Sequence, residues 1–190
     1  MEDLSQHMLD LAFNSLEAGC TDLQICIRED LKSNILEFMV RDNGHGIDRG
    51  DMEKVLDPFF TTKEKARVGL GISLLKEAVE RCDGIFKIDS LPRVGTCVYA
   101  VFTRDHVDRA PLGDMTGTII SLITAGGDME MVYHHEFNRR QFYFSTEELK
   151  LSLEGISIQT TAVLVWLEEY LSKEIKALRR GKNEKFGRAG

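Results

Sequence analysis

Between residues 42 and 71 the sequence reads Asp42-Asn43-Gly44-His45-Gly46-Ile47, then Asp57-Pro58-Phe59-Phe60-Thr61-Thr62-Lys63, and then Gly69-Leu70-Gly71. Each run alone indicates little, because Asp-Asn-Gly is a common turn and glycine-rich tripeptides are frequent in loops. Their order is informative, since the first run follows a strand-like stretch and the last precedes a helix-like one. Together they predict one site assembled from a turn, a loop and a helix start.

The first run ends a predicted strand at residues 34–41. Its residues alternate between apolar and other side chains, with Leu36, Phe38 and Val40 on the apolar side, which is the period of a half-buried strand. Another strand is expected just before it, at residues 23–29. Asp42 therefore comes at the end of a strand, where open α/β sheets tend to hold ligands.

The last run opens a predicted helix that Asp83-Gly84 ends. Glycines just ahead of a helix expose backbone N–H groups, and the positive end of the helix dipole faces them. This arrangement suits a phosphate group. Residues 51–56 are expected to form a short helix that Asp57-Pro58 ends, since Pro disfavours helix at the residue before it.

A first helix is predicted at residues 3–17. At 100° per residue, one broad arc is apolar and the opposite, narrower arc is polar; the polar arc contains Asp3, Gln6, His7, Asp10, Asn14 and Glu17. On its own this polar stripe is typical of a solvated surface.

These features resemble the four sequence boxes of the GHKL (Bergerat-fold) ATP-binding superfamily, over about residues 5–103. The resemblance implies an α+β fold, an α/β sandwich whose mixed sheet is covered on one face by helices, with ATP and Mg²⁺ as ligands. It further implies that Asn14 coordinates Mg²⁺ and that the Asp42 carboxylate accepts a hydrogen bond from the adenine amino group. The other implied nucleotide contacts are Gly44, Gly46, Ile47, Phe60, Thr61, Thr62, Lys63, Gly69, Leu70, Gly71 and Thr96.

The resemblance also implies a catalytic role for Asp10, and this residue, Phe60 and Lys63 are each open to a second interpretation. The family carries Glu where this chain has Asp10, and the Asp side chain is shorter by about 1.5 Å. We therefore expect either that ATP hydrolysis is slow or that Asp10 mainly holds water around the Mg²⁺ ion. Phe60 would serve as a core residue beneath the nucleotide. Lys63 is equally compatible with a phosphate contact and with a solvated side chain.

We expect a nucleotide-binding domain at residues 1–104 and an extension at residues 105–190 packed on it, with a basic tail from about residue 179. The extension is predicted to contain a helix at 115–125, a hairpin of 130–135 with 140–144, and helices at 147–153 and 161–178. The apolar stripe of the last helix fits its own domain or a partner. His134-His135 is not expected to bind a metal, because adjacent strand residues point to opposite faces.

Composition excludes several classes of protein. A chain of 190 residues with a net charge of −7 is a poor general nucleic-acid binder. No apolar run reaches the length of about 20 residues that crosses a bilayer, so no membrane contact is expected. The four cysteines have no metal-site spacing and no signal peptide precedes them, which indicates buried thiols in a reducing cytoplasm.

Three functions stay open. The chain is a kinase-like regulatory protein that phosphorylates or switches a separate protein partner, a slow ATPase, or a non-catalytic nucleotide-binding module. The first is favoured because the helical element that carries the phosphoacceptor histidine of histidine kinases is not expected here, and because the stretch from Pro58 to Gly71 resembles anti-sigma-factor serine kinases. The sequence is compatible with a homodimer.

Overall fold

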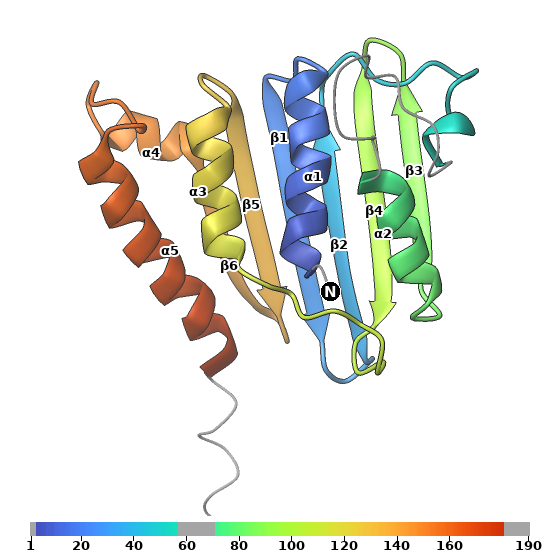
Figure 1. Ribbon diagram of the computed structural model, residues 1–190. Helices are drawn as coiled ribbons and strands as arrows, with labels where there is room; N and C mark the ends of the chain where they lie inside the picture. The colour runs from blue at the N-terminus through green and yellow to red at the C-terminus, as the bar shows by residue number, and fades with distance from the viewer. Residues whose placement is uncertain (1–2, 57–70, 181–190) are drawn as a thin grey trace, which may run out of the picture.

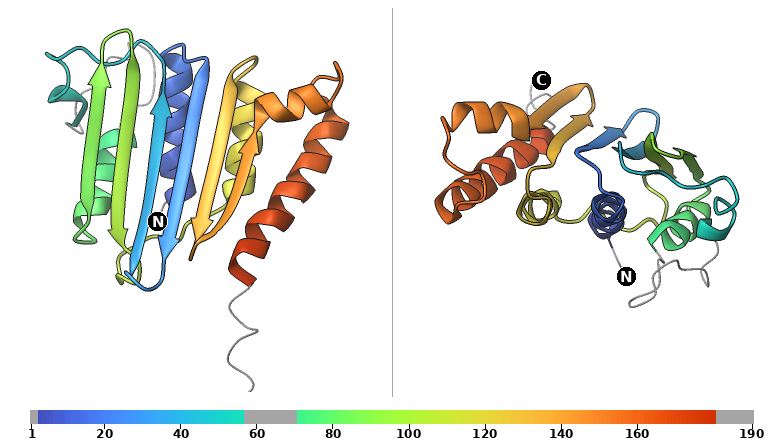
Figure 2. Two further views of the ribbon diagram at one scale, coloured as in Figure 1. Left: turned by 180° about the vertical axis from the view of Figure 1, so that it is seen from behind. Right: turned by 90° about the horizontal axis from the view of Figure 1, so that it is seen from above.

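The computed structural model describes residues 3–56 and 71–180. It is an α+β structure with a single sheet whose one face is covered by helices (Figures 1 and 2). Helices α1, α2 and α3 lie on this face, and α5 packs beside α3 near the edge strand β6. The helices are α1 (Leu4–Glu17), α2 (Gly71–Glu80), α3 (Met115–Ala125), α4 (Thr146–Ser152) and α5 (Thr161–Arg180).

Within the described residues, six strands form the sheet in the order β3-β4-β2-β1-β5-β6. They are β1 (Asp22–Asp30), β2 (Ile35–Asp42), β3 (Ile85–Leu91), β4 (Gly95–Thr103), β5 (Glu130–Phe137) and β6 (Arg140–Ser145). Neighbours are antiparallel except for β1 and β5, which run parallel, so the sheet is mixed as predicted. The same sheet continues across the predicted boundary at residue 104, since β5 and β6 both come from the predicted extension.

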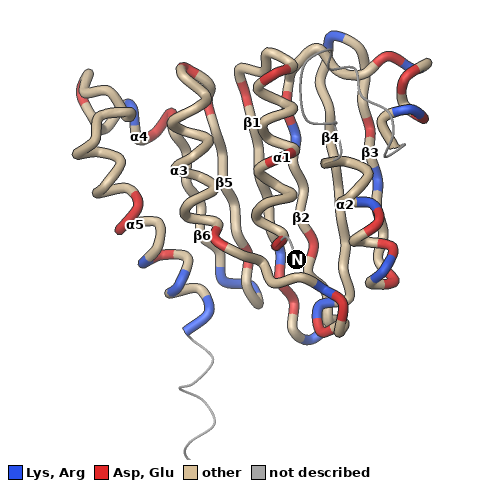
Figure 3. Tube along the Cα trace, viewed as in Figure 1, with Lys and Arg blue, Asp and Glu red and all other residues tan. Residues whose placement is uncertain are grey.

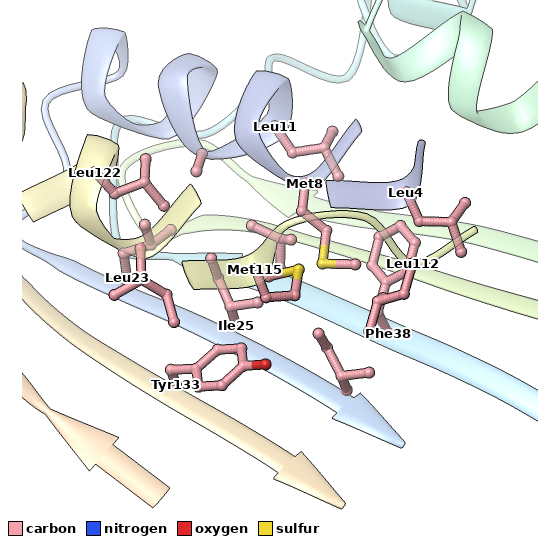
Figure 4. Close-up of a cluster of buried hydrophobic side chains, with 14 of the residues drawn as sticks. Leu4, Met8, Leu11, Leu23, Ile25, Phe38, Leu112, Met115, Leu122 and Tyr133 are labelled. Atoms are coloured by element: carbon pink, nitrogen blue, oxygen red, sulfur yellow. The ribbon is translucent and has the colours of Figure 1, made fainter. Parts of the chain in front are cut away.

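The core lies between the sheet and the helices. Figure 4 shows side chains of α1 and α3 meeting those of β1, β2 and β5, among them Leu4, Met8, Leu11, Leu23, Ile25, Phe38, Met115, Leu122 and Tyr133. Each is at most 3 % exposed. Burying a large apolar side chain contributes about 1.5–3 kcal/mol, so this layer fixes how α1 and β2 sit relative to each other. Those two elements carry Asp10, Asn14 and Asp42 of the predicted site.

Helix α1 is more deeply buried than its sequence predicts. Asp3 caps its start by accepting a hydrogen bond from the backbone N–H of Gln6 at 3.0 Å. His7, predicted on the exposed polar stripe, is 5 % exposed, which makes that part of the prediction wrong. The reason is that α1 is flanked by both α2 and α3, and that the connector after β4 crosses its first turn, where the Leu4 N–H donates to the Pro111 carbonyl.

The elements of the extension follow the predicted ranges closely. Helix α3 coincides with its prediction, and the Ser145 side chain caps the start of α4 by accepting from the Glu148 N–H. The hairpin of β5 and β6 turns at Asn138 and Arg139, which are both at positive φ. The helix predicted at residues 51–56 is only a 3₁₀ turn, Lys54–Leu56, because so short a segment cannot sustain α-helical hydrogen bonding.

The cysteines are only partly as predicted. Cys20 and Cys82 are buried, whereas Cys26 and Cys97 are half-buried, so the prediction is wrong for these two. Both lie on strands at positions that alternate with core residues, and they therefore point to the face without helices.

A buried ionic cluster joins α5 to the sheet, at the end of β1 away from the predicted site. The Glu29 side chain is 3 % exposed and accepts from Arg179 Nη2 at 2.6 Å. His135 Nε2 lies 3.2 Å from the same carboxylate, and its Nδ1 lies 2.9 Å from the Tyr133 hydroxyl. His135 is 0 % exposed, whereas His134 is half-buried on the opposite face, as the strand period predicted. The cluster links α5, the last helix described, to β1, the first strand in the chain.

Candidate functional site

Three parts of the predicted site come together at one end of the sheet. The last turn of α1 carries Asn14 and Ser15, β2 ends at Asp42, and α2 begins at Gly71. Helix α1 and strand β2 run towards this end together (Figure 1). The segments are close neighbours, because Ser15 Oγ donates to Asp42 Oδ2 at 2.6 Å.

The Asp42 carboxylate is fixed from three sides. It accepts from Ser15 Oγ, from the Gly44 N–H at 2.8 Å and from the Thr96 N–H at 3.3 Å. The two backbone donors use Oδ1, and the hydroxyl uses Oδ2. An ionised carboxylate has about four acceptor positions. Asp42 Oδ2 therefore keeps one acceptor position for a ligand, in an orientation that the protein has already fixed.

The loop after Asp42 needs its glycines for close backbone approach. A Cβ on Gly44 would lie 2.9 Å from the Ala18 carbonyl, and one on Gly46 would lie 2.2 Å from the Leu91 carbonyl. Gly46 also has φ +68°, which L side chains rarely adopt. The loop thus packs directly against the end of α1 and the β3–β4 turn, where Ile47 N–H donates to Ser90 Oγ at 2.9 Å.

Gly46→Ala is expected to destabilise the protein by about 2 kcal/mol or more, because a methyl group would overlap a backbone carbonyl that cannot move without opening the β3–β4 turn. Thermal unfolding measures the effect. Gly50→Ala is the matched control, since a Cβ there meets nothing within 4 Å. Equal melting temperatures for the two variants would contradict the packing described here.

Asp10 and Asn14 both face the start of α2. A Cβ on Gly71 would lie 3.1 Å from Asp10 Cβ and 3.9 Å from Asn14 Nδ2. The four-residue spacing puts the two side chains on one face of α1, as predicted. The positive dipole end of α2 is therefore next to a carboxylate and an amide.

Residues 2–106 match the family described as "Histidine kinase-, DNA gyrase B-, and HSP90-like ATPase", which is more than half of the chain. The chain belongs to this family. Its α+β architecture is that of the histidine-kinase-like ATPase domain, and membership implies that the domain binds ATP. The six predicted contacts Phe60, Thr61, Thr62, Lys63, Gly69 and Leu70 lie outside the described residues, and their roles stay predictions.

The chain is similar to several bacterial kinases. The chain is 33% identical over 105 residues to sporulation kinase A of Bacillus subtilis (strain 168), covering 53% of this chain and 16% of that protein. It is 34% identical over 95 residues to the signal transduction histidine-protein kinase AtoS of Escherichia coli (strain K12), covering 50% of this chain and 16% of that protein. The chain thus spans about a sixth of the length of these curated relatives.

Solved structures also give matches that cover about half of the chain. The catalytic domain of the histidine kinase ThkA matches with 23% identity and a TM-score of 0.44, covering 55% of this chain and 68% of that one. Full-length ShkA in complex with AMPPNP matches with 16% identity and a TM-score of 0.43, covering 52% of this chain and 20% of that one.

The residues of the ATPase domain fit a nucleotide. The spare acceptor of Asp42 can take an amino proton of adenine, and Gly44 lets the loop pack closely enough for its N–H to hold the other oxygen of this carboxylate. The start of α2 offers N–H groups to phosphate. Within residues 3–56 and 71–180, no helix has both the length and the apolar composition needed to cross a membrane.

Sequence reasoning missed three residues that build this end of the ATPase domain. Ser15 and Ser90 hold the side chain of Asp42 and the backbone of Ile47, respectively. Asn43 Oδ1 accepts from the N–H groups of Thr21 and Asp22, at 2.9 and 3.0 Å, which joins the loop to the start of β1. Ser15 directly follows Asn14 and Asn43 lies inside the glycine run, so position gave a signal for both; nothing in the sequence marks Ser90.

Cys20 lies near this end of the sheet and stays protonated at neutral pH. Burial, reinforced by the negative charges of Asp42 and Asp22, raises the pKa of its thiol to about 11. The thiolate is the reactive form of cysteine, so Cys20 offers no nucleophile to the site.

Proposed function

We propose that this chain binds ATP with Mg²⁺ and acts on a separate protein, by phosphorylating it or by switching it with the state of the nucleotide. The observation that carries the proposal is the Asp42 carboxylate, which three donors fix at the end of β2 with one acceptor left over. Removing a carboxylate from water is costly unless each of its acceptor positions has a partner. An oriented carboxylate with one acceptor position left over is therefore better explained by a ligand than by a purely structural role.

In this proposal Asp42 and the Gly44–Gly46 backbone hold the base, and the first turn of α2 receives phosphate oxygens. Asn14 supplies an oxygen ligand to Mg²⁺. Among the described residues no group of three or more His, Cys, Asp or Glu side chains could hold a metal ion, so the ion would be shared between Asn14, water and the phosphates. ATP supplies the γ-phosphoryl group, and the partner supplies the acceptor.

The experiment has two steps. Calorimetric titration with ATP, in Mg²⁺ and in EDTA, tests whether the chain binds the nucleotide and whether the metal strengthens binding. Incubation with γ-labelled ATP and a co-purified partner protein then follows the label. Label on the partner supports a kinase, and released phosphate supports an ATPase. A chain that binds no ATP contradicts both.

Slow ATP hydrolysis is the second candidate, because Asp10 occupies the place where the resemblance implies Glu. Its Cβ lies next to the start of α2, which supports a role for its carboxylate in accepting a proton from water near a phosphate. A general base works within about 2.6–3.2 Å of the atom that loses the proton, and the shorter side chain gives up about 1.5 Å of reach.

Asp10→Glu is expected to raise the rate of ATP hydrolysis by about tenfold or more, because it restores that reach. Phosphate release at saturating MgATP measures it. Asp10→Asn, which removes the basic group but keeps the shape, should lower the rate instead. A Glu variant that is no faster than the wild type would show that the length of this side chain does not limit hydrolysis.

A further inference from the structure

The face of the sheet without helices carries a groove of about 700 Å³ at the same end as Asp42. One row of residues in register crosses all six strands, and every member lines the groove: Asp89, Cys97, Arg41, Gln24, Val132 and Ser145. Their neighbours along the strands, such as Val40 and Met131, are buried beneath the helices. The row therefore points away from the helices, which cover the other face of the sheet (Figure 2). The groove shares Asp42 and Thr96 with the predicted nucleotide site and otherwise lies on the face without helices.

The length of the groove favours a protein segment over a small molecule. Six strands about 4.8 Å apart span about 24 Å, which is the length of about seven residues of extended chain. The groove is also open along its length, because no helix of the described residues covers this face of the sheet.

Apolar side chains are exposed in the groove. Met39 and Val132 are half-buried on its floor. Leu91 and Val94, at the β3–β4 turn, are 54 % and 63 % exposed and form one end. A ligand with apolar side chains would remove this surface from water, at about 25 cal/mol per Å².

The charge of the groove selects a cationic partner. Exposed carboxylates line it at both ends and in the middle: Asp89 on β3, Asp22 on β1 and Glu147 on α4. Glu130 also lines it but is paired with Lys150 Nζ at 2.9 Å. Arg41 is the one basic residue among the lining residues that the structure describes. Lys and Arg residues gather instead at the far end of α5 (Figure 3).

We propose that this groove binds a positively charged, amphipathic segment of a separate protein, whose apolar side chains cover Met39, Val132 and Leu91 and whose cations meet Asp22, Asp89 and Glu147. Nucleic acid is disfavoured because its phosphates would face these carboxylates. Asp42, Asn43 and Thr96 line the groove as well as the other site, so a segment bound here lies directly behind the residues that fix the Asp42 carboxylate.

Binding is tested with a fluorescein-labelled peptide of alternating lysine and leucine, about twelve residues long, so that it exceeds the groove. Its fluorescence anisotropy is titrated with the whole chain at physiological salt and without nucleotide, so that failure of ATP binding cannot affect the result. We expect saturable binding, and none to the peptide in which glutamate replaces lysine. Absence of saturable binding overturns the proposal.

Two pairs of variants separate the groove from the net charge of the chain. Asp89→Lys is expected to weaken binding about tenfold, while Glu168→Lys, the same charge change on exposed α5, changes it less than about twofold. Arg41→Glu should strengthen binding about tenfold, and a gain in affinity cannot result from misfolding. Arg180→Glu, the same charge change on α5, is the control for this variant. Equal effects within each pair overturn the proposal. So does a chain that sediments as a dimer which Asp89→Lys dissociates, because the groove is then filled by a second copy.

Discussion

Asp42→Asn is expected to lower the affinity for ATP about 10- to 100-fold without lowering the melting temperature. The asparagine oxygen can take over both backbone bonds of Oδ1, from Gly44 and Thr96. Its amide nitrogen replaces Oδ2 and can donate to Ser15 Oγ, which still reaches the Leu11 carbonyl at 3.2 Å as a donor. Every local hydrogen bond is therefore preserved, and only the spare acceptor is lost. A hydrogen bond to a charged group contributes about 1.5–3 kcal/mol.

The same variant tests which base is recognised. Adenine presents an amino group where guanine presents a carbonyl oxygen, and the new amide N–H suits the carbonyl. The ratio of ATP to GTP affinity should therefore fall, as measured by calorimetry with both nucleotides. Glu168→Gln, which neutralises an exposed carboxylate on α5, serves as the control. Unchanged affinity for ATP in Asp42→Asn, with an unchanged melting temperature, would remove Asp42 from base recognition.

The parts of the fold that follow from local pattern could be predicted from the sequence. The alternation of Leu36, Phe38 and Val40 gives strand β2 and places Asp42 at its end, and Asp114 and Ser145 mark the starts of α3 and α4. These features depend on residues only a few positions apart, so the local sequence is enough to predict them.

Pairing between distant strands could not be predicted in this way. β1 pairs in parallel with β5 more than 100 residues later, with Asp22 opposite Glu130, and no local pattern specifies that partner. The burial of His7 depends on the same long-range arrangement, because the connector that crosses α1 comes after β4. In the candidate site, Asp42 was found from the glycine run, whereas Ser90 was missed because only the fold brings it to Ile47.

Glu29 shows a further limit, since its position in β1 reads as the polar end of a strand while the fold buries it among cations. Burial alone would raise the pKa of the Glu29 carboxyl, but the hydrogen bonds from His135 and Arg179 and the charge of Arg179 outweigh it, so the pKa is lowered. Arg104 Nε is buried, lies 3.8 Å from Glu29 Oε2 and has no hydrogen-bond partner among the described residues. One carboxylate therefore lies within 4 Å of two arginines.

Glu29→Gln is expected to destabilise the protein by about 3 kcal/mol at neutral pH, because removing one partner of a buried ion pair leaves the others uncompensated. Removing one partner of a buried ion pair costs about 3–5 kcal/mol. The lower end of this range applies, since the Arg179 side chain is 45% exposed and can turn to water. The free energy of unfolding in urea measures the loss. Glu37→Gln is the matched control on the opposite face: Glu37 accepts from Arg28 and from the Tyr99 hydroxyl, but Arg28 is 42% exposed, so about 1 kcal/mol or less is expected.

The effect of Glu29→Gln should also depend on pH, in a direction that the lowered pKa fixes. A carboxyl whose pKa is lower in the folded state stabilises the protein fully above the ordinary glutamate value of about 4.3, and this contribution disappears as the pH falls through the folded-state pKa below it. The difference in unfolding free energy between wild type and Glu29→Gln should therefore be constant from neutral pH down to about pH 5 and shrink in stronger acid. A difference that stayed constant into strong acid would mean that the variant acts through shape, and that the charge of Glu29 does not hold α5 on the sheet.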